Sequence, residues 1–134
     1  MAVVVANRDN CDPTNEVEFI HRPYRCAEAS LKGMVGVFDA NGYVVQTNTA
    51  PTAGVEIAGI FMRRCGVSEA VSMFQQGFMA GYDVSGLAIG APLYAGADGE
   101  VADAGTVVIG KVMPFSYSGE KMAYIDVLQT WAGA

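Results

Sequence analysis

The side chains able to do chemistry are few and widely spaced in this sequence. His21 is the only histidine, so a Ser/His/Asp or Cys/His arrangement would have one possible base. The segment around it, residues 1–29, contains two prolines and no sustained apolar period, and we expect no rigid scaffold to orient the imidazole. We therefore predict that the chain is not an enzyme.

The three cysteines, Cys11, Cys26 and Cys65, fit neither a metal site nor a disulfide framework. Together with His21 they offer four soft ligands, but the gaps of 9, 4 and 38 residues do not match the close pairs of structural zinc sites. An odd number of cysteines without a C-x-x-C pair predicts reduced thiols. We predict no metal and no other cofactor.

The remaining charged clusters indicate turns or a docking surface. Asp98, Glu100 and Asp103 lack the further carboxylates and the terminal Glu of a calcium loop, and the Asp-Gly step beside them is typical of a hairpin turn. Arg63-Arg64 is the only basic dipeptide. It either ends a strand in solvent or meets an acidic surface on another protein.

Composition and charge limit the possible partners further. The chain of 134 residues has the size of one domain, with 51% apolar and 16% charged residues. Its net charge of −6 opposes binding to nucleic acid and to anionic membranes. No apolar run has the length of a membrane span, and the apolar N-terminal stretch is too short for a signal peptide. We expect synthesis in the cytoplasm, with no nucleic-acid or membrane partner.

The elements that must position these residues fall into two parts. Residues 1–29 are predicted to form an extended N-terminal arm, in which Val17, Phe19 and His21 could form one strand at a sheet edge, because prolines remove ladder donors. Residues 30–134 are predicted to form a compact β domain. We expect the arm to be ordered by docking onto a partner.

The compact part is predicted to be mostly β, a small β-barrel or β-sandwich of about seven short strands. Residues 67–73 fit both a helix capped by Ser68 and a strand, and glycines after them favour the strand. Asn41-Gly42 predicts a type I′ hairpin with positive φ at both positions. We place the strands at residues 34–38, 43–47, 55–62, 92–94, around 101, 106–113 (covered on both faces) and 122–128.

Five short motifs stand out in the compact part: Leu31-Lys32-Gly33-Met34-Val35, Ile57-Ala58-Gly59-Ile60, Ile89-Gly90-Ala91-Pro92-Leu93-Tyr94, Gly99-Glu100-Val101 and Val108-Ile109-Gly110-Lys111-Val112-Met113. Together these motifs resemble the capsid decoration, or cement, proteins of tailed bacteriophages. The resemblance covers about residues 31–128. It implies a β-rich structural protein that binds the outer surface of an icosahedral phage head, often as a trimer, and bridges major capsid subunits.

Two groups of residues are candidates for partner binding. Tyrosine and arginine often dominate protein interfaces, so Arg22, Tyr24 and Arg25 in the arm are the first candidates for capsid contact, followed by Arg63 and Arg64. On the decoration hypothesis the chain is a virion protein that forms a homotrimer and binds the major capsid protein. The alternative is a small-ligand or carbohydrate-binding β module that uses exposed aromatic residues, namely Tyr82, Tyr94, Phe115 and Tyr117.

Overall fold

The computed structural model describes residues 4, 10–14, 19–52, 54–115 and 119–128 and is nearly all β. A short 3-10 turn, η2 (Ala97–Gly99), precedes the seventh strand. None of the helices in these ranges is long and apolar enough to span a membrane. Nine strands share one sheet: β1 (Ile20–Arg25), β2 (Val35–Phe38), β3 (Val44–Gln46), β4 (Ile57–Phe61), β5 (Ala70–Met79), β6 (Pro92–Ala95), β7 (Val101–Ala102), β8 (Val108–Pro114) and β9 (Lys121–Asp126).

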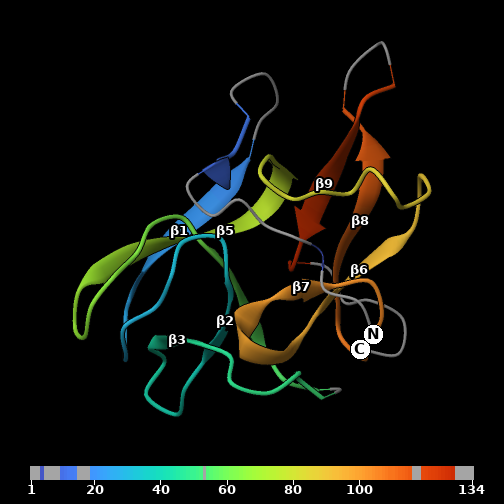
Figure 1. Ribbon diagram of the computed structural model, residues 1–134. Coiled ribbons are helices and arrows are strands. Elements are labelled where there is room, and N and C mark those ends of the chain that lie inside the picture. The colour runs from blue at the N-terminus through green and yellow to red at the C-terminus, as the bar shows by residue number, and fades with distance from the viewer. Residues whose placement is uncertain (1–3, 5–9, 15–18, 53, 116–118, 129–134) are drawn as a thin grey trace.

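The sheet is antiparallel and curls into a half-barrel (Figure 1). Its order is β3-β2-β4-β5-β9-β8-β6-β7, and β1 is added as an extra partner of β5. The long strand β5 pairs with three different strands along its length. Residues 70–76 of β5 pair with β1, residues 73–74 pair with β4, and residues 76–79 pair with β9. The barrel-like class predicted from the sequence is confirmed.

Two apolar clusters occupy opposite faces of β4 and β5. Ile60 and Phe74 belong to the larger cluster, which β6, β8 and β9 complete. A backbone bridge between Cys26 and Val44 brings the end of β1 to β3, so β1–β5 surround the smaller cluster. We call this smaller cluster the ring core. It consists of Cys26, Met34, Val44, Ala58, Phe61, Cys65, Val71 and Met73.

The predicted strands agree with β2–β4 and β6–β9 to within about two residues. The segment 67–73, which fits both a helix and a strand, leads into a longer strand, β5, that begins at Ala70 and continues to Met79. The described sheet has nine strands rather than about seven.

One expectation about burial is wrong. We expected the segment 106–113 to be covered on both faces, but in β8 Val108, Lys111 and Met113 are only half-buried. The strand segments with both faces covered are β4 and residues 73–75 of β5, because they lie between the two apolar clusters.

The β2–β3 hairpin has a different turn from the one predicted. Gly42 has a φ of 80°, but the φ of Asn41 is not positive. The Gly42 amide donates to the Asp39 carbonyl at 3.1 Å, and the Asp39 amide donates to the Tyr43 carbonyl at 2.8 Å. This pattern is a type I turn followed by a glycine in the left-handed region. The Asp39 carboxylate fixes the turn by accepting from the Asn41 and Tyr43 amides.

The described part of residues 1–29 packs on the rest of the chain and is not a free arm. β1 pairs with β5 over six residues, and Val4, Cys11 and Cys26 are buried. The Val4 amide also donates to the Val101 carbonyl at 2.8 Å. Backbone pairing holds β1 although its side chains are mostly exposed, which is why hydrophobic periodicity did not reveal its role. Val17, part of the expected edge strand, lies outside the described residues.

The edge strand is predicted at residues 17–21, with Pro23 beyond its end, but β1 spans Ile20–Arg25 and contains Pro23. The Cys26 amide donates to the Glu69 carbonyl on the β5 side. Successive amide groups along a strand point to opposite edges of it, and the register from Arg22 to Arg25 is unbroken. The amide nitrogen of Pro23, three residues before Cys26, thus points away from β5. The missing N–H therefore lies on the outer edge of β1, where it weakens no hydrogen bond to β5.

Candidate functional site

The turn between β4 and β5 carries the most exposed large apolar side chain among the described residues. Val67 is 67% exposed, and it follows directly on the buried Cys65 and the half-buried Gly66. Ser68 has a φ of 67°, an uncommon conformation for a residue with a side chain, and its amide donates to the Cys26 carbonyl at 2.8 Å. The left-handed backbone at Ser68 thus fixes Val67 at the tip of the turn.

Four arginines lie at or near this turn: Arg63 and Arg64 belong to it, and Arg22 and Arg25 come from β1. Arg25 is the register partner of Ala70, and Arg22 is the partner of Met73, so both lie beside the first half of β5. Arg63 and Arg64 follow the end of β4. We define the arginine end as Arg22, Arg25, Arg63, Arg64 and Val67. All four arginines were predicted as partner-binding residues, and the fold places them in one region of the sheet.

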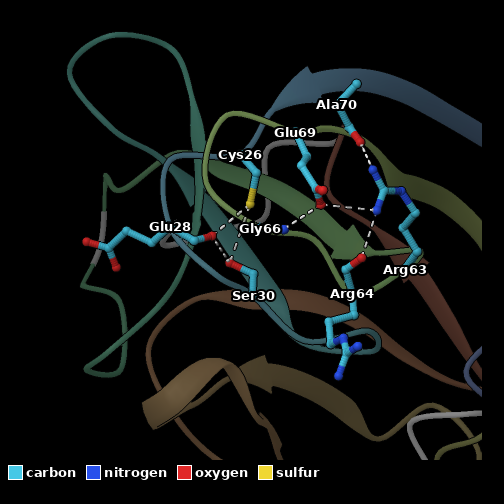
Figure 2. A network of polar contacts seen from close by, with 8 residues as sticks. All are labelled: Cys26, Glu28, Ser30, Arg63, Arg64, Gly66, Glu69 and Ala70. Carbon is cyan, nitrogen blue, oxygen red and sulfur yellow. Dashed lines mark hydrogen bonds and ion pairs between the residues drawn. The ribbon is translucent and has the colours of Figure 1, made fainter.

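Arg63 is held within the turn by several contacts, as Figure 2 shows. Its Nη1 atom donates to the Arg64 carbonyl at 2.8 Å and lies 3.6 Å from the Glu69 carboxylate. Its Nη2 atom donates to the Ala70 carbonyl. Glu69 in turn accepts from the Gly66 amide at 2.6 Å. Arg63 therefore supports the turn from within.

The Glu69 carboxylate stays ionised because the turn is built around it. The hydrogen bond from the Gly66 amide, and then the nearby Arg63 guanidinium, lower the pKa of Glu69. Its negative charge faces a permanent positive charge on Arg63, so the pair adds little net charge to the surface. The positive charge of Arg64 is not balanced in this way.

Arg25 and Tyr24 hold β1 against its neighbours. The Arg25 guanidinium lies 5.0 Å from the centre of the Tyr43 ring and donates to the Tyr43 hydroxyl and to Ser68 Oγ. The Tyr24 ring packs edge-on against Phe38 at 5.1 Å. Its hydroxyl accepts from Gln75 Nε2 at 3.3 Å. Both predicted capsid anchors therefore have intramolecular contacts, and a substitution at either would change stability as well as any binding.

Arg22 and Arg64 differ from the other two arginines. Within the ranges that the structure describes, neither side chain takes part in a hydrogen bond or an ion pair, and both are exposed. In Figure 2 the Arg64 guanidinium points away from the network that surrounds Arg63. These two guanidinium groups are therefore available to an external carboxylate.

An open groove of about 620 Å³ lies beside the turn and is lined by Arg63 and Arg64. Ser30, one of the lining residues, donates from Oγ to the Glu28 carbonyl at 3.1 Å, and the Cys26 thiol donates to the same oxygen at 2.8 Å. Burial, and then the neighbouring Cys26 thiol, raise the pKa of Cys65 to about 12. The other lining residues are Ala29, Ser30, Leu31, Cys65, Gly66 and Glu69.

The other chemical candidates are not assembled into a site. All three cysteines are buried and lie outside any disulfide bond. His21 lies exposed on β1 with its ring centre 5.6 Å from that of Phe19. Among the described residues, no group of three or more His, Cys, Asp or Glu side chains is arranged to hold a metal ion.

Of the aromatic residues proposed for carbohydrate binding, the three that the structure describes do not form one exposed platform. Tyr82 is buried, which corrects the expectation of an exposed ring, and its hydroxyl donates to the Gly33 carbonyl at 2.6 Å. Tyr94 is half-buried on β6. Phe115 packs edge-on against Phe78 at 5.3 Å. Tyr117 lies outside the described residues.

Comparison of the chain with known protein families, with curated proteins and with solved structures finds no match. The site therefore has to be interpreted from its own geometry. Sequence reasoning identified the four arginines but missed three residues of the site. Val67 is its exposed apolar side chain, Glu69 contacts Arg63, and Tyr43 contacts Arg25. The available signal was the step Gly66-Val67-Ser68, one residue after the basic dipeptide, because an apolar residue in a polar turn is a candidate contact.

Proposed function

We propose that this chain is a capsid decoration protein that binds the outer surface of an icosahedral bacteriophage head and bridges major capsid subunits. The short motifs between residues 31 and 128 support the proposal through their resemblance to that family. The proposed role is structural and needs no catalysis and no cofactor. It places the protein in the virion.

The observation that carries the proposal is the arginine end. Protein interfaces have an apolar centre with a polar rim, and arginine is enriched in them. Val67 supplies an exposed apolar contact. Arg64 in the same turn, and Arg22 further along β1 opposite Met73, supply unpaired positive charge. The chain as a whole carries a net charge of −6, so this concentration of positive charge favours one orientation toward an acidic surface.

A homotrimer fits the proposed role for a general physical reason. Each copy in a trimer adds one docking surface, and linked surfaces bind a repetitive lattice more tightly than a single surface does. A protein that binds only the assembled shell stabilises that shell by mass action. Weak individual contacts are therefore sufficient for a cement protein.

The test is cosedimentation of the purified protein with empty heads of the phage that encodes it. We expect the wild-type chain to pellet with the heads, and Val67→Asp to stay in the supernatant because it places a negative charge at the centre of the contact. Ile89→Asp is the matched control, since Ile89 is another exposed apolar residue, 50% exposed, in the loop between β5 and β6.

A wild-type protein that stays in the supernatant contradicts the proposed function. Equal loss of binding by Val67→Asp and Ile89→Asp would place the contact elsewhere. Both variants change an exposed side chain, so circular dichroism is expected to show the same melting temperature for both as for the wild type.

A further inference from the structure

The two adjacent arginines of the β4–β5 turn have different surroundings. Arg63 contacts the Arg64 carbonyl, the Ala70 carbonyl and the Glu69 carboxylate. Arg64 lines the same groove, but in Figure 2 its guanidinium points away from these groups. Arg63 thus stabilises the turn, whereas the guanidinium of Arg64 is exposed beside it.

The charges around the groove leave Arg64 as its unbalanced group. Glu69 is the one acidic side chain in the lining. It accepts a hydrogen bond from the Gly66 amide and forms an ion pair with the Arg63 guanidinium. The Cys65 thiol stays protonated and neutral at physiological pH because its pKa is about 12. No other lining residue carries a charge, so the groove has a net positive charge located at Arg64.

We infer that this groove binds a carboxylate side chain of an acidic protein segment, with Arg64 as the residue that contacts it. The inference rests on the proposed function for the identity of the partner, the capsid surface, but the site itself is defined by this chain. A guanidinium binds a carboxylate through two parallel hydrogen bonds, which gives the contact a direction as well as a charge. Leu31, an exposed lining residue, adds apolar surface to the same groove.

The net charge of the chain favours an acidic protein segment over a nucleic acid as the occupant of the groove. A nucleic acid would meet a chain with a net charge of −6 and would gain little from one free arginine in a groove. An extended acidic segment needs only a local positive charge and a groove open to solvent. The groove meets both requirements.

The experiment measures binding of a fluorescein-labelled peptide of alternating Glu and Ala residues by fluorescence anisotropy. The same peptide with Gln in place of Glu tests the need for a carboxylate. We expect the wild-type protein to bind the Glu peptide and not the Gln peptide, with weaker binding at high salt. Arg64→Ala is expected to weaken binding about tenfold, the effect of losing one charge-assisted contact.

Two further variants separate binding from structure and from total charge. Lys111→Ala removes the same charge from β8, outside the groove, and is expected to leave peptide binding unchanged. Arg63→Ala is expected to lower the melting temperature, because it removes the contacts that hold the turn. Arg64→Ala is expected to keep the wild-type melting temperature.

Three results would overturn the inference: equal weakening by Arg64→Ala and Lys111→Ala, equal affinity for the Glu and Gln peptides, or unchanged binding in Arg64→Ala. The peptide assay contains no phage particle, so its outcome is independent of the proposed function. Loss of head binding with intact peptide binding would contradict the decoration role and leave the carboxylate site standing.

Discussion

Tyr24 is the residue at which the sequence and the structure give opposite expectations, and its substitution distinguishes them. As a capsid anchor, Tyr24 would contribute nothing to the stability of the free protein. In the structure its ring is half-buried, packs edge-on against Phe38 at 5.1 Å and accepts a hydrogen bond from Gln75. Tyr24→Ala should therefore destabilise the isolated chain.

The magnitude follows from these contacts. Truncation of a fully buried aromatic ring costs about 3–5 kcal/mol, so the half-buried ring of Tyr24 accounts for about 2 kcal/mol. The edge-on contact with Phe38 adds about 0.5–1.5 kcal/mol. We expect a total of about 3 kcal/mol, which lowers the melting temperature by roughly 10 °C for a chain of this size. Tyr24→Phe keeps the ring and loses one long hydrogen bond, so it should cost less than about 1 kcal/mol.

The assay is urea and thermal unfolding followed by circular dichroism on the free protein, without any partner. A melting temperature of Tyr24→Ala equal to that of the wild type would refute the intramolecular role of Tyr24. It would also restore the sequence-based expectation that this side chain is kept free for a partner. A large effect of Tyr24→Phe would mean that the hydrogen bond to Gln75, rather than ring packing, holds β1 in place.

Three other predictions test the described fold. Residues 30–134 alone should give a largely unfolded circular dichroism spectrum, because deletion of residues 1–29 removes β1 and opens the ring core; a stable β spectrum would show that β1 is dispensable. Gly42→Ala should cost about 1 kcal/mol in thermal unfolding because its φ of 80° is unfavourable for a side chain, whereas Gly86→Ala, also in open space but without a positive φ, should cost less. The raised pKa of Cys65 means that the folded protein binds more protons than the unfolded one between pH 9.0 and about 12, so stability should be full below pH 9.0 and fall as pH rises through this window. Unfolding experiments along this pH series should show a smaller slope for Cys65→Ala, and an unchanged slope would contradict a buried neutral thiol.

Much of the β domain could be predicted because its strands leave local signals. Glycine and Asx turns separate β-branched runs, and these positions agree with β2–β4 and β6–β9. The Ile-Gly-x-Val motif needs glycine at position 110 because a Cβ atom there would overlap the Tyr124 carbonyl of β9. That reason depends on the pairing of two strands and is not visible in the sequence.

The role of residues 1–29 could not be predicted, because β1 is held by long-range backbone pairing. Its exposed side chains and its proline are typical of a free segment, and the strand that receives it lies about 50 residues further along the chain. The candidate site was predictable only as a set of arginines. Which of them is available depends on Glu69 and Ala70, and the turn geometry at Ser68 brings these groups beside Arg63.

The position of Pro23 also affects how copies of this chain behave when they are crowded. The outer edge of β1 is unpaired from Ile20 to Arg25 in the described structure, and such an edge can act as a template for a strand of another molecule. A strand docking there would find no N–H at residue 23 and would meet exposed Arg22 and Arg25 on either side. Edge-to-edge sheet growth, the first step toward fibrils, is thereby disfavoured. Many copies can then lie close together on one surface and still remain separate folded units.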